Sequence, residues 1–501
     1  MKILNSQQVL AIDKETLASQ YISSFKLMER ASTKVFDKLK DRYKLYQTSF
    51  VILCGKGNNG GDGLALARLL KEGGAFVRVY LLQAKKYTPE SVQNQDLLEE
   101  RDIAVEKFTP KAKIKIKPDD IVIDAMFGIG LSEVLGDEWN DFFKHINEEK
   151  CYDRVSIDMP SGLFADVSTP KTANVFKANI VYTFQLPKLS LLLPESKEYV
   201  KEFEVVDINL DADAIAKAET MCYFVDKDRV KSKLKKGSKF DHKGCFGHAL
   251  VMGGSFGKIG AMVLASKAAM KSGSGLVSAY IPGCGYTTMQ TAIPEVMCLV
   301  GEDEKQLVNF PDVSNYDAVG VGCGLGTSKE TAKGFVAFLK GAKEAKMVID
   351  ADGLNIISEQ KCLDKVPAQT ILTPHEKELS RLIGTWDSDF DKIEKVKTMA
   401  KKHNLVFVVK GAHTMVVTPS EEVYFNSTGN WGMATAGSGD TLTGIITSLL
   451  GQGYAAEDAA IVGVYLHGLA GDCAVESIHP YSLLASDISN AISTAYKRLY
   501  E

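Results

Sequence analysis

The chain has 501 residues, of which 45% are hydrophobic and 24% charged, as is usual for a soluble globular protein. Its 59 Lys and Arg residues against 63 Asp and Glu give a formal net charge of −4, which offers no electrostatic reason to expect nucleic acid or an anionic membrane as a partner. At about 150 residues per domain, the length predicts two or three domains.

Cysteine usage and the N-terminus bear on the cellular compartment. The nine cysteines are scattered, with no Cys-x-x-Cys pair and no zinc-finger spacing, and the N-terminal segment becomes polar after four residues. No apolar run approaches the roughly 20 residues of a membrane span. We therefore expect reduced thiols, no signal peptide, a cytoplasmic location, and no membrane or nucleic-acid partner.

Helix and strand patterns alternate through the first 210 residues. Helices are predicted at 6–18, 23–45 and 61–74, and strands at 50–54, 76–82, 121–125, 154–158, 179–184 and 203–208. Runs of Val and Ile without polar alternation are typical of parallel strands covered on both faces. Strands separated by helix-length segments predict right-handed βαβ units and a doubly wound, Rossmann-like sheet over residues 1–210.

A short, polar, Ala-rich stretch at 211–220 is interpreted as a linker. Residues 221–501 then alternate again, which predicts a second α/β domain without motifs shared with the first. Strands are predicted at 248–254, 276–281, 317–322, 347–350, 370–374 and 405–411, with a helix at 258–272 and further helices towards the end. Two unlike α/β domains on one chain suggest two linked activities.

The first strand leads into the glycine-rich stretch GKGNNGGDG at 55–63. A strand-to-helix turn of this kind places backbone N–H groups beside a helix N-terminus, which suits a phosphate, although a tight turn without a ligand remains the alternative. The next strand ends at Gln83 without the acid that a dehydrogenase uses to hold the ribose, and no Gly-Lys-Ser/Thr follows. The loop is therefore unlike that of an ordinary NAD dehydrogenase or a Walker-type enzyme.

Polar chemistry gathers at the ends of three predicted strands. Asn58, Asn59 and Asp62 follow the first, Asp124 ends the strand 121–125, and Asp158 ends the strand 154–158. A single strand-end Asp is often a turn former or a helix cap. Because the carboxyl ends of parallel strands share one edge of a sheet, three such loops together predict a ligand crevice.

The stretches GKGNNGGDG, DAMFGIGLSEVL and SIDMPSG together resemble the NAD(P)H-hydrate epimerase family, over essentially residues 1–210. The resemblance implies an enzyme that interconverts the R and S epimers of NADHX and NADPHX, in which water has added to the nicotinamide ring. Epimerisation requires opening and reclosing the hydroxyl-bearing carbon, so a proton donor and acceptor must flank it. We expect Asp158 to be this acid/base.

The resemblance also implies binding residues. The implied substrate contacts are Asn58, Asn59, Gly60, Gly61, Asp62, Gly128, Ile129, Gly130, Leu131, Ser132, Glu133 and Val134. The implied K⁺ ligands are Asn59, Asp124 and Ser161, and oxygen-rich ligation suits a hard alkali cation.

The second domain contains the stretch TGNWGMATAGSGDTLTG, in which Gly437, Ser438, Gly439 and Asp440 open an amphipathic helix. Glycines allow the backbone to approach a phosphate, and the helix N-terminus stabilises negative charge there. Asp440 at this place can take the proton of a substrate hydroxyl as it attacks phosphorus. A helix-start Asp with no catalytic role is the simpler alternative, but the two glycines are superfluous for capping.

Other polar groups follow predicted strands of the second domain. Asp350, Asp352 and Asn355 could hold Mg²⁺ through water. Thr373 and Glu376 form a plausible capping box with Pro374 at the first helical position, which leaves His375 unexplained. Lys410 and Gly411 end a strand where a nucleotide could rest, although a solvated lysine is an equally good interpretation.

The glycine-rich anion hole followed by Asp440 resembles the ribokinase-like superfamily. The stretches HKGCFGHALVMGGS, GVGCGLG, TPHEKEL and GMATAGSGDTLTG narrow the resemblance to the NAD(P)H-hydrate dehydratase family, over about residues 225–500. The family phosphorylates the hydroxyl of the hydrate and then eliminates phosphate to restore the dihydronicotinamide. The resemblance is to the ADP-using form, in which ADP is the phosphoryl donor and AMP and phosphate are released.

The residues implied by this second resemblance fall into two groups. Contacts with the hydrated dinucleotide are implied for Ala261, Gly324, His375 and Asp440. Contacts with ADP are implied for Lys410, Gly411, Ala412, His413, Thr414 and Gly439.

Taken together, the patterns predict a bifunctional repair enzyme of NAD(P)H hydrates, with K⁺ and Mg²⁺ as cofactors and a homo-oligomeric state. The dehydratase takes only the S epimer, so a fused epimerase makes both epimers usable. The alternative is a ribokinase-like kinase of a small molecule, such as a vitamin precursor, fused to a nucleotide-binding sensor or scaffold domain.

Overall fold

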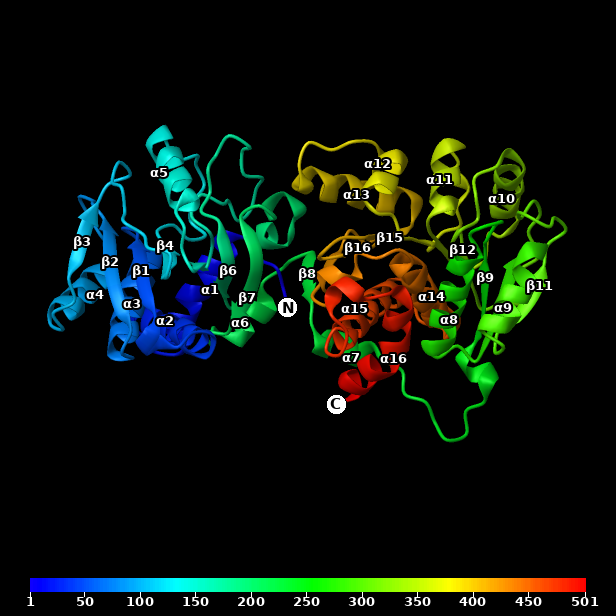
Figure 1. Ribbon diagram of the computed structural model, residues 1–501, viewed down its shortest axis with the longest axis horizontal. Coiled ribbons are helices and arrows are strands. Elements are labelled where there is room, and N and C mark those ends of the chain that lie inside the picture. The colour runs from blue at the N-terminus through cyan, green and yellow to red at the C-terminus, as the bar shows by residue number, and fades with distance from the viewer. The chain divides into compact units, whose positions relative to one another are not determined.

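The structure is a computed structural model that describes residues 1–501. It contains two compact units, of which the first comprises Met1–Thr220 and the short segment Ser388–Phe390, and the second comprises Met221–Asp387 and Asp391–Glu501 (Figure 1). No helix combines the length and the apolar character needed to cross a membrane.

The first unit contains a seven-stranded, wholly parallel sheet in the order β3-β2-β1-β4-β5-β6-β7. Its strands are β1 (Ser49–Cys54), β2 (Phe76–Leu82), β3 (Val105–Phe108), β4 (Asp120–Ala125), β5 (Asp153–Ile157), β6 (Ala178–Phe184) and β7 (Val200–Val206). Its helices are α1 (Ser6–Ser19), α2 (Ser24–Arg42), α3 (Asn58–Glu72), α4 (Pro89–Glu99), α5 (Asp137–Glu148) and α6 (Ala212–Lys217). The strand order reverses between β1 and β4, so a crevice is expected at their carboxyl ends.

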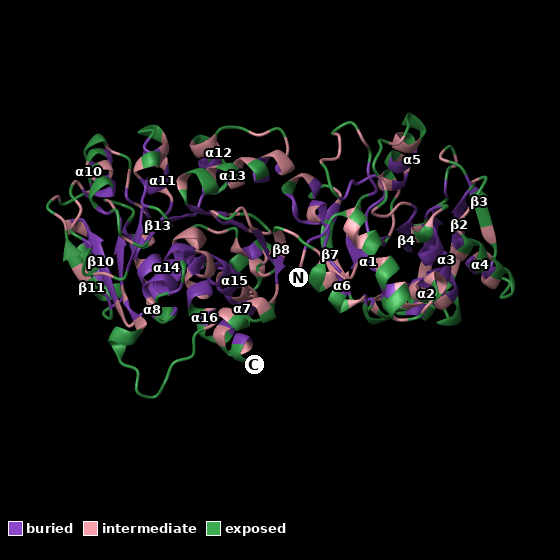
Figure 2. Ribbon diagram, turned by 180° about the vertical axis from the view of Figure 1, so that it is seen from behind, coloured by how far each residue is buried: buried purple, intermediate pink, exposed green.

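Both faces of this sheet are covered. Successive side chains of β1 alternate, so that Phe50 and Ile52 pack with α2, α3 and α4, whereas Val51 and Leu53 pack with Phe142 and Phe143 of α5. Figure 1 shows α5 on the opposite side of the sheet from α2 and α3. The buried strands in Figure 2 are therefore the centre of a doubly wound layer, as the sequence predicts.

The second unit contains a ten-stranded sheet in the order β11-β10-β9-β12-β13-β14-β15-β16-β17-β8, parallel except for the antiparallel pairs β15-β16 and β16-β17. Its strands are β8 (Cys222–Val225), β9 (His248–Met252), β10 (Leu276–Ile281), β11 (Met297–Val300), β12 (Ala318–Val321), β13 (Met347–Ile349), β14 (Ile371–Leu372), β15 (Val406–Val409), β16 (Met415–Val417) and β17 (Val423–Asn426). Its helices are α7 (Lys227–Lys233), α8 (Ile259–Lys271), α9 (Tyr286–Ala292), α10 (Lys329–Gly341), α11 (Asp352–Glu359), α12 (Glu376–Ile383), α13 (Asp389–His403), α14 (Ser438–Gly451), α15 (Ala456–Ala474) and α16 (Ala485–Tyr500).

Helix α14 lies at the centre of the second unit. It packs against α8 and α15, and Ile445, Ile446 and Leu449 are fully or almost fully buried. Figure 1 places α14, α15 and α16 on the opposite side of the sheet from α11, α12 and α13. The start of α14 is therefore fixed by the core of the unit.

Some elements differ from the sequence predictions. The stretch 211–220, interpreted as a linker, contains α6, capped by the Asp211 side chain, and is part of the first unit. Helix α3 begins at Asn58, three residues before the predicted start, so Asn58 and Asn59 belong to its first turn rather than to a loop. The hairpin of β16 and β17 was not predicted, because strands of three and four residues carry too little periodic signal.

Candidate active sites

The first candidate site surrounds Asp124, the fully buried carboxylate near the end of β4. Its Oδ1 accepts hydrogen bonds from Ser161 Oγ at 2.5 Å and Met126 N at 3.2 Å, and its Oδ2 from Ser161 N at 2.7 Å and Ser156 Oγ at 3.0 Å. Burial raises the pKa of Asp124 to about 6, although the hydrogen bonds from Ser161 oppose the rise. Asp124 forms no salt bridge, so its negative charge has no basic side chain beside it.

Asn59 joins this group from the first turn of α3. Its Nδ2 atom is buried without a hydrogen-bond partner, and a β-carbon on Gly128 would lie 3.5 Å from its side chain. The Ser161 hydroxyl links the same place to the backbone N of Phe127 at 2.9 Å. The loops after β1, β4 and β5 thus converge. The Asp124 carboxylate, the Ser161 hydroxyl and the Asn59 side-chain oxygen are the kinds of oxygen ligand that a hard alkali cation takes.

The turn that carries Asn59 depends on close backbone contact. A β-carbon on Gly60 would lie 1.9 Å from the carbonyl oxygen of Gly55, and one on Gly55 would lie 1.8 Å from that of Met126. Any side chain at either position would push the first turn of α3 away from the loop after β4. These glycines therefore set the spacing between the two loops, whatever ligand they hold.

Asp158 follows β5 in a left-handed conformation, with φ of 64°, which is uncommon for a residue other than glycine. Its Oδ1 accepts hydrogen bonds from Lys188 Nζ at 2.5 Å and from Phe184 N at 3.2 Å. Lys188 also donates to Thr183 Oγ1 at 2.9 Å and to the Phe184 carbonyl at 3.0 Å, and it is 2% exposed. The predicted acid/base is therefore one half of a buried ion pair.

Two further carboxyl groups are coupled to this ion pair. Burial, followed by repulsion from Asp158 and Asp13, raises the pKa of Asp62 well above its usual value. Burial and the Asp158 charge raise the pKa of Asp13, a residue of α1, to about 6, and Lys188 partly counteracts this. Two carboxyl groups with raised pKa values are thus coupled to the Asp158–Lys188 ion pair.

The other predicted substrate residues of the first unit differ in their exposure. Asn58 is exposed, Gly60, Gly61 and Asp62 are buried, and the segment 128–134 is half-buried or exposed. Ile129 accepts a hydrogen bond from Ser6 Oγ of α1 at 3.0 Å through its carbonyl. The segment 128–134 therefore forms an accessible rim, with α1 attached to it.

The second candidate site lies at the start of α14. Gly437 is the N-cap residue with φ of 87°, and a β-carbon there would lie 2.3 Å from Leu264 Cδ1, so only glycine fits. Asp440 follows in the first helical turn. Burial raises its pKa to about 6, a hydrogen bond with the Cys323 thiol lowers it, and repulsion from Asp350 raises it further.

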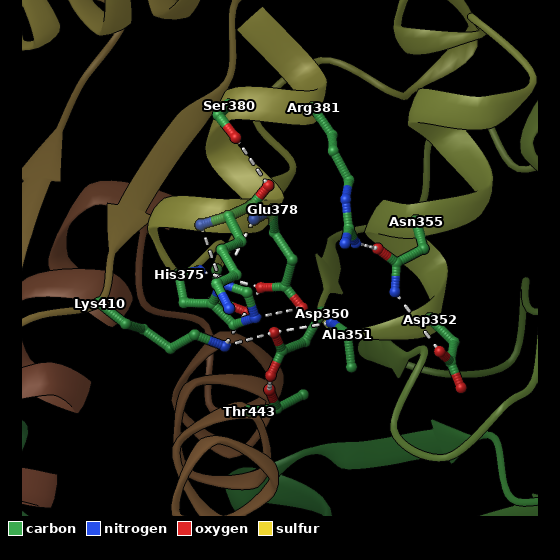
Figure 3. A network of polar contacts seen from close by, with 12 residues as sticks. Asp350, Ala351, Asp352, Asn355, His375, Glu378, Ser380, Arg381, Lys410 and Thr443 are labelled. Carbon is green, nitrogen blue, oxygen red and sulfur yellow. Dashed lines mark hydrogen bonds and ion pairs between the residues drawn. The ribbon is translucent and has the colours of Figure 1, made fainter. Parts of the chain in front are cut away.

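A network of polar side chains faces this helix start (Figure 3). Asp350, which follows β13, accepts hydrogen bonds from Lys410 Nζ at 2.7 Å and Thr443 Oγ1 at 2.8 Å. A β-carbon on Gly439 would lie 3.3 Å from Lys410 Nζ, which places that ammonium beside the helix N-terminus. Burial alone would lower the pKa of Lys410, but the carboxylates of Asp350 and Glu378 raise it, so Lys410 stays charged.

The residues predicted to hold Mg²⁺ are already engaged with the protein. Asp350 is paired with Lys410, and Asp352 accepts from Lys258 Nζ at 3.2 Å and Gly326 N at 2.8 Å. Asn355 Oδ1 accepts from Arg381 at 2.7 Å. These oxygens do not present an open set for direct coordination; the predicted contact with Mg²⁺ through water stays a prediction, and no step of the reaction is assigned to a metal there.

His375 has a structural role that the sequence interpretation missed. Helix α12 begins at Glu376, and His375 is its N-cap residue: Nδ1 accepts from Lys377 N at 3.1 Å and Glu378 N at 3.3 Å. Glu378 completes the capping box by accepting from His375 N at 2.9 Å. The predicted box of Thr373 and Glu376 is therefore wrong by two residues, because a histidine ring nitrogen replaces the usual capping oxygen.

The remaining predicted residues of the second unit lie in the same neighbourhood. A β-carbon on Gly324 would lie 3.3 Å from Ala261 Cβ, so these two positions are adjacent. His375 pairs with Lys410 in a short parallel bridge, and Lys410 N donates to the Pro374 carbonyl at 2.9 Å. In the segment 410–414, Gly411 and Ala412 are exposed, whereas His413 Nδ1 lies 3.1 Å from the Asn426 carbonyl.

Several potentially functional residues escaped the sequence reasoning. These are Asp13, Lys188, Cys323 and His467. His467 of α15 contacts Ser438 Oγ at 3.3 Å, and burial lowers its pKa to about 4, so it is neutral at physiological pH. Cys323 lies within the stretch GVGCGLG, but its thiol was given no role there. Asp13, Lys188 and His467 lie outside the quoted motifs, and only the fold brings them to the sites.

A parallel Rossmann-like unit followed by a ribokinase-like unit, each with polar groups at its strand ends, defines a two-site α/β enzyme. Residues 24–190 match the family described as YjeF-related protein N-terminus, and residues 249–494 match the family described as NAD(P)H-hydrate dehydratase. The chain belongs to the bifunctional NAD(P)H-hydrate repair enzymes, and it combines an NAD(P)H-hydrate epimerase with an NAD(P)H-hydrate dehydratase.

Three similar proteins illustrate the relationship. The bifunctional NAD(P)H-hydrate repair enzyme Nnr of Moorella thermoacetica is 32% identical over 528 residues, covering 100% of this chain and 98% of its own. That of Coxiella burnetii is 32% identical over 495 residues, covering 97% of each. A ribokinase-like superfamily protein from Enterococcus faecalis is 26% identical, covers 56% of this chain and 98% of its own, and has a TM-score of 0.50.

Proposed function

We propose that the first unit epimerises NADHX and NADPHX around Asp158 and that the second unit dehydrates the S epimers around Asp440, with ADP as phosphoryl donor. The observation that carries this assignment is the geometry of Asp440. It stands in the first turn of a glycine-led helix, its pKa is raised to about 6, and the Lys410 ammonium lies beside the adjacent Gly439. A proton acceptor (Asp440), a helix N-terminus and a fixed positive charge (Lys410) thus lie side by side.

The dehydration takes place in two steps. Asp440 accepts the proton of the substrate hydroxyl as the oxygen attacks the terminal phosphorus of ADP, and AMP leaves. The phosphate ester then loses phosphate with its bonding electron pair, and loss of a proton from the neighbouring ring carbon forms the double bond of NADH or NADPH. Backbone N–H groups at the start of α14 and the Lys410 ammonium stabilise the charge on the transferring phosphate.

The nucleotide is proposed to lie along the segment 410–414 and Gly439. Because the His413 ring faces the Asn426 carbonyl, backbone groups of the exposed Gly411 and Ala412 are the natural contacts for the nucleotide. The hydrated ring is proposed to contact Ala261 and Gly324, which are adjacent, together with His375 and Asp440. Because His375 Nδ1 is occupied by the cap, the proposed contact would go through the exposed ring's Nε2, which lies 3.5 Å from Glu378 Oε1.

In the first unit, Asp158 and Lys188 face the hydrated ring as an ion pair. A K⁺ ion, if bound by Asn59, Asp124 and Ser161, would supply a fixed positive charge for the pyrophosphate. The convergence of the three loops and the uncompensated Asp124 carboxylate support this placement. The remaining residues of 58–62 and 128–134 would enclose the dinucleotide.

Recovery of NADH absorbance from a mixed R and S hydrate preparation tests the proposal, with ADP, with ATP and without nucleotide. We expect complete, nucleotide-dependent recovery in two phases. The first phase is direct dehydration of the S epimer, and the second is recovery of the R epimer after epimerisation. The second phase should be faster than spontaneous epimerisation. Recovery that stalls at the S fraction would contradict the epimerase assignment. No recovery with either nucleotide would contradict the dehydratase assignment.

A further inference from the structure

Helix α1 borders the crevice of the first unit. Ser6, at its first turn, donates to the carbonyl of Ile129 in the rim segment 128–134 at 3.0 Å, and the Ser6 backbone N donates to Asp166 at 3.0 Å. Residues seven apart lie on the same face of a helix, so Asp13 is on the face that Ser6 turns towards the crevice. Asp13 is only partly exposed, and its carboxyl group interacts electrostatically with both Asp158 and Lys188.

We propose that Asp13 is a second catalytic residue of the epimerase, the acid that works with Asp158 on the hydroxyl-bearing carbon; this rests on the function proposed above. Asp158 comes from the end of β5, whereas Asp13 comes from α1, a separate element attached to the rim of the same crevice. Two carboxyl groups from different elements give the reaction the donor and acceptor that it needs.

The chemistry balances with these two groups alone. The carbon–oxygen bond breaks with its electron pair going to oxygen, which takes a proton from Asp13 and leaves as water. The ring-nitrogen lone pair forms a carbon–nitrogen double bond in its place. Water then adds from the opposite face, loses a proton to a carboxylate, and returns the nitrogen lone pair. Nothing is oxidised or reduced, and no further reactant is consumed.

The charges around Asp13 favour the protonated form that this role requires. Burial and then the Asp158 charge raise the pKa of Asp13 to about 6, although the Lys188 ammonium, which is paired with Asp158, partly opposes the rise. Asp62 is the third carboxyl group beside this ion pair, but it is buried, and burial raises its pKa well above the usual value. Asp13, with partial exposure, can exchange its proton between turnovers.

The test is Asp13→Asn in the full chain, with ADP and a mixed R and S hydrate preparation. The second phase of NADH recovery should slow at least a hundredfold towards the spontaneous rate, while the first phase, which reports the second unit, is unchanged. Glu15→Gln removes an exposed carboxylate of the same helix and should leave both phases unaltered. An Asp13→Asn rate within threefold of wild type would overturn the proposal.

The wild-type pH profile keeps the proposal falsifiable if Asp13→Asn misfolds. After subtraction of spontaneous epimerisation, kcat/KM for the R epimer should fall as pH rises through about 6, because Asp13 loses its proton; the groups that face it are Asp158, Lys188 and Asp62. A rate that is flat or rising from pH 5.5 to 8 would overturn it. A wild-type second phase no faster than the spontaneous one would instead refute the epimerase assignment itself.

Discussion

Replacing Asp440 by Asn removes the proposed proton acceptor of the second unit while retaining the shape of the side chain. Without a general base, the dehydration rate should fall by a factor of about 10² to 10⁴. Epimerisation should persist, because the crevice of the first unit contains none of the residues of the α14 site. The same substitution also changes stability, in a direction that follows from the pKa of Asp440.

The folded-state pKa of Asp440 is raised to about 6 from an ordinary 3.8, mainly by burial. Its charged form therefore destabilises the fold: the cost is absent below pH 4, grows as pH rises from 4 to 6, and is constant above 6. The full difference corresponds to at most about 3 kcal/mol. Because the side chain retains partial solvent exposure, we expect Asp440→Asn to raise the unfolding free energy of the second unit by about 1–2 kcal/mol at pH 7.5.

The assay is thermal unfolding of wild type and Asp440→Asn at pH 5.0 and 7.5, with NADH recovery measured on the same preparations. The stability gain should be larger at pH 7.5 than at pH 5.0. The matched control is Asp364→Asn, an exposed carboxylate of the same unit, which should change neither stability nor activity. An Asp440→Asn protein that is active, or that is destabilised equally at both pH values, would refute the burial argument and the assignment of the base.

Three further experiments test the first unit. Lys188→Met leaves the buried Asp158 carboxylate without its partner, so the unfolding free energy of that unit should fall by about 3–5 kcal/mol and epimerisation should be lost. An unchanged unfolding free energy would contradict the buried ion pair. Gly60→Ala sets a β-carbon 1.9 Å from the Gly55 carbonyl, so epimerisation should be lost while the S epimer is still dehydrated, as two-phase NADH recovery will show. Replacing K⁺ by a bulky organic cation should slow epimerisation by the wild-type protein. The Asp124→Asn variant should show no further slowing when K⁺ is replaced. A wild-type rate that does not change with K⁺ would argue against the cation site.

The parts of the sites that could be predicted from sequence are those that stand at strand ends. Asp124 stands near the end of the mostly apolar β4 and Asp158 directly follows β5, and the parallel topology predicted for this part of the chain places both at one edge of the sheet. Gly437 to Asp440 could be predicted for a similar reason, since a glycine pair before an apolar helix has few other uses. In each case local pattern and global topology agree.

The parts that could not be predicted are those that depend on long-range packing. Lys188 is one lysine among many, and only the path of the chain after β6 brings it to Asp158, thirty residues earlier. Asp13 lies in the middle of a helix whose polar residues predict a solvated face. The cap at His375 was missed because the sequence rule expects a hydroxyl or carboxylate at that position, whereas the structure uses a ring nitrogen.

Two carboxylates of the second unit could act as its base, and the structure distinguishes them. Asp350 has one oxygen on the Lys410 ammonium and the other on the Thr443 hydroxyl, so taking up a proton would break an ion pair and disturb the hydrogen bonds around a buried group. Asp440 forms no salt bridge, and the Asp350 charge helps to raise its pKa. In the proposed mechanism, Asp350 thus fixes the Lys410 ammonium that faces the phosphate, and its charge at the same time makes Asp440 the better proton acceptor. This division of labour explains why two carboxylates stand at one helix start, when the chemistry itself needs only one.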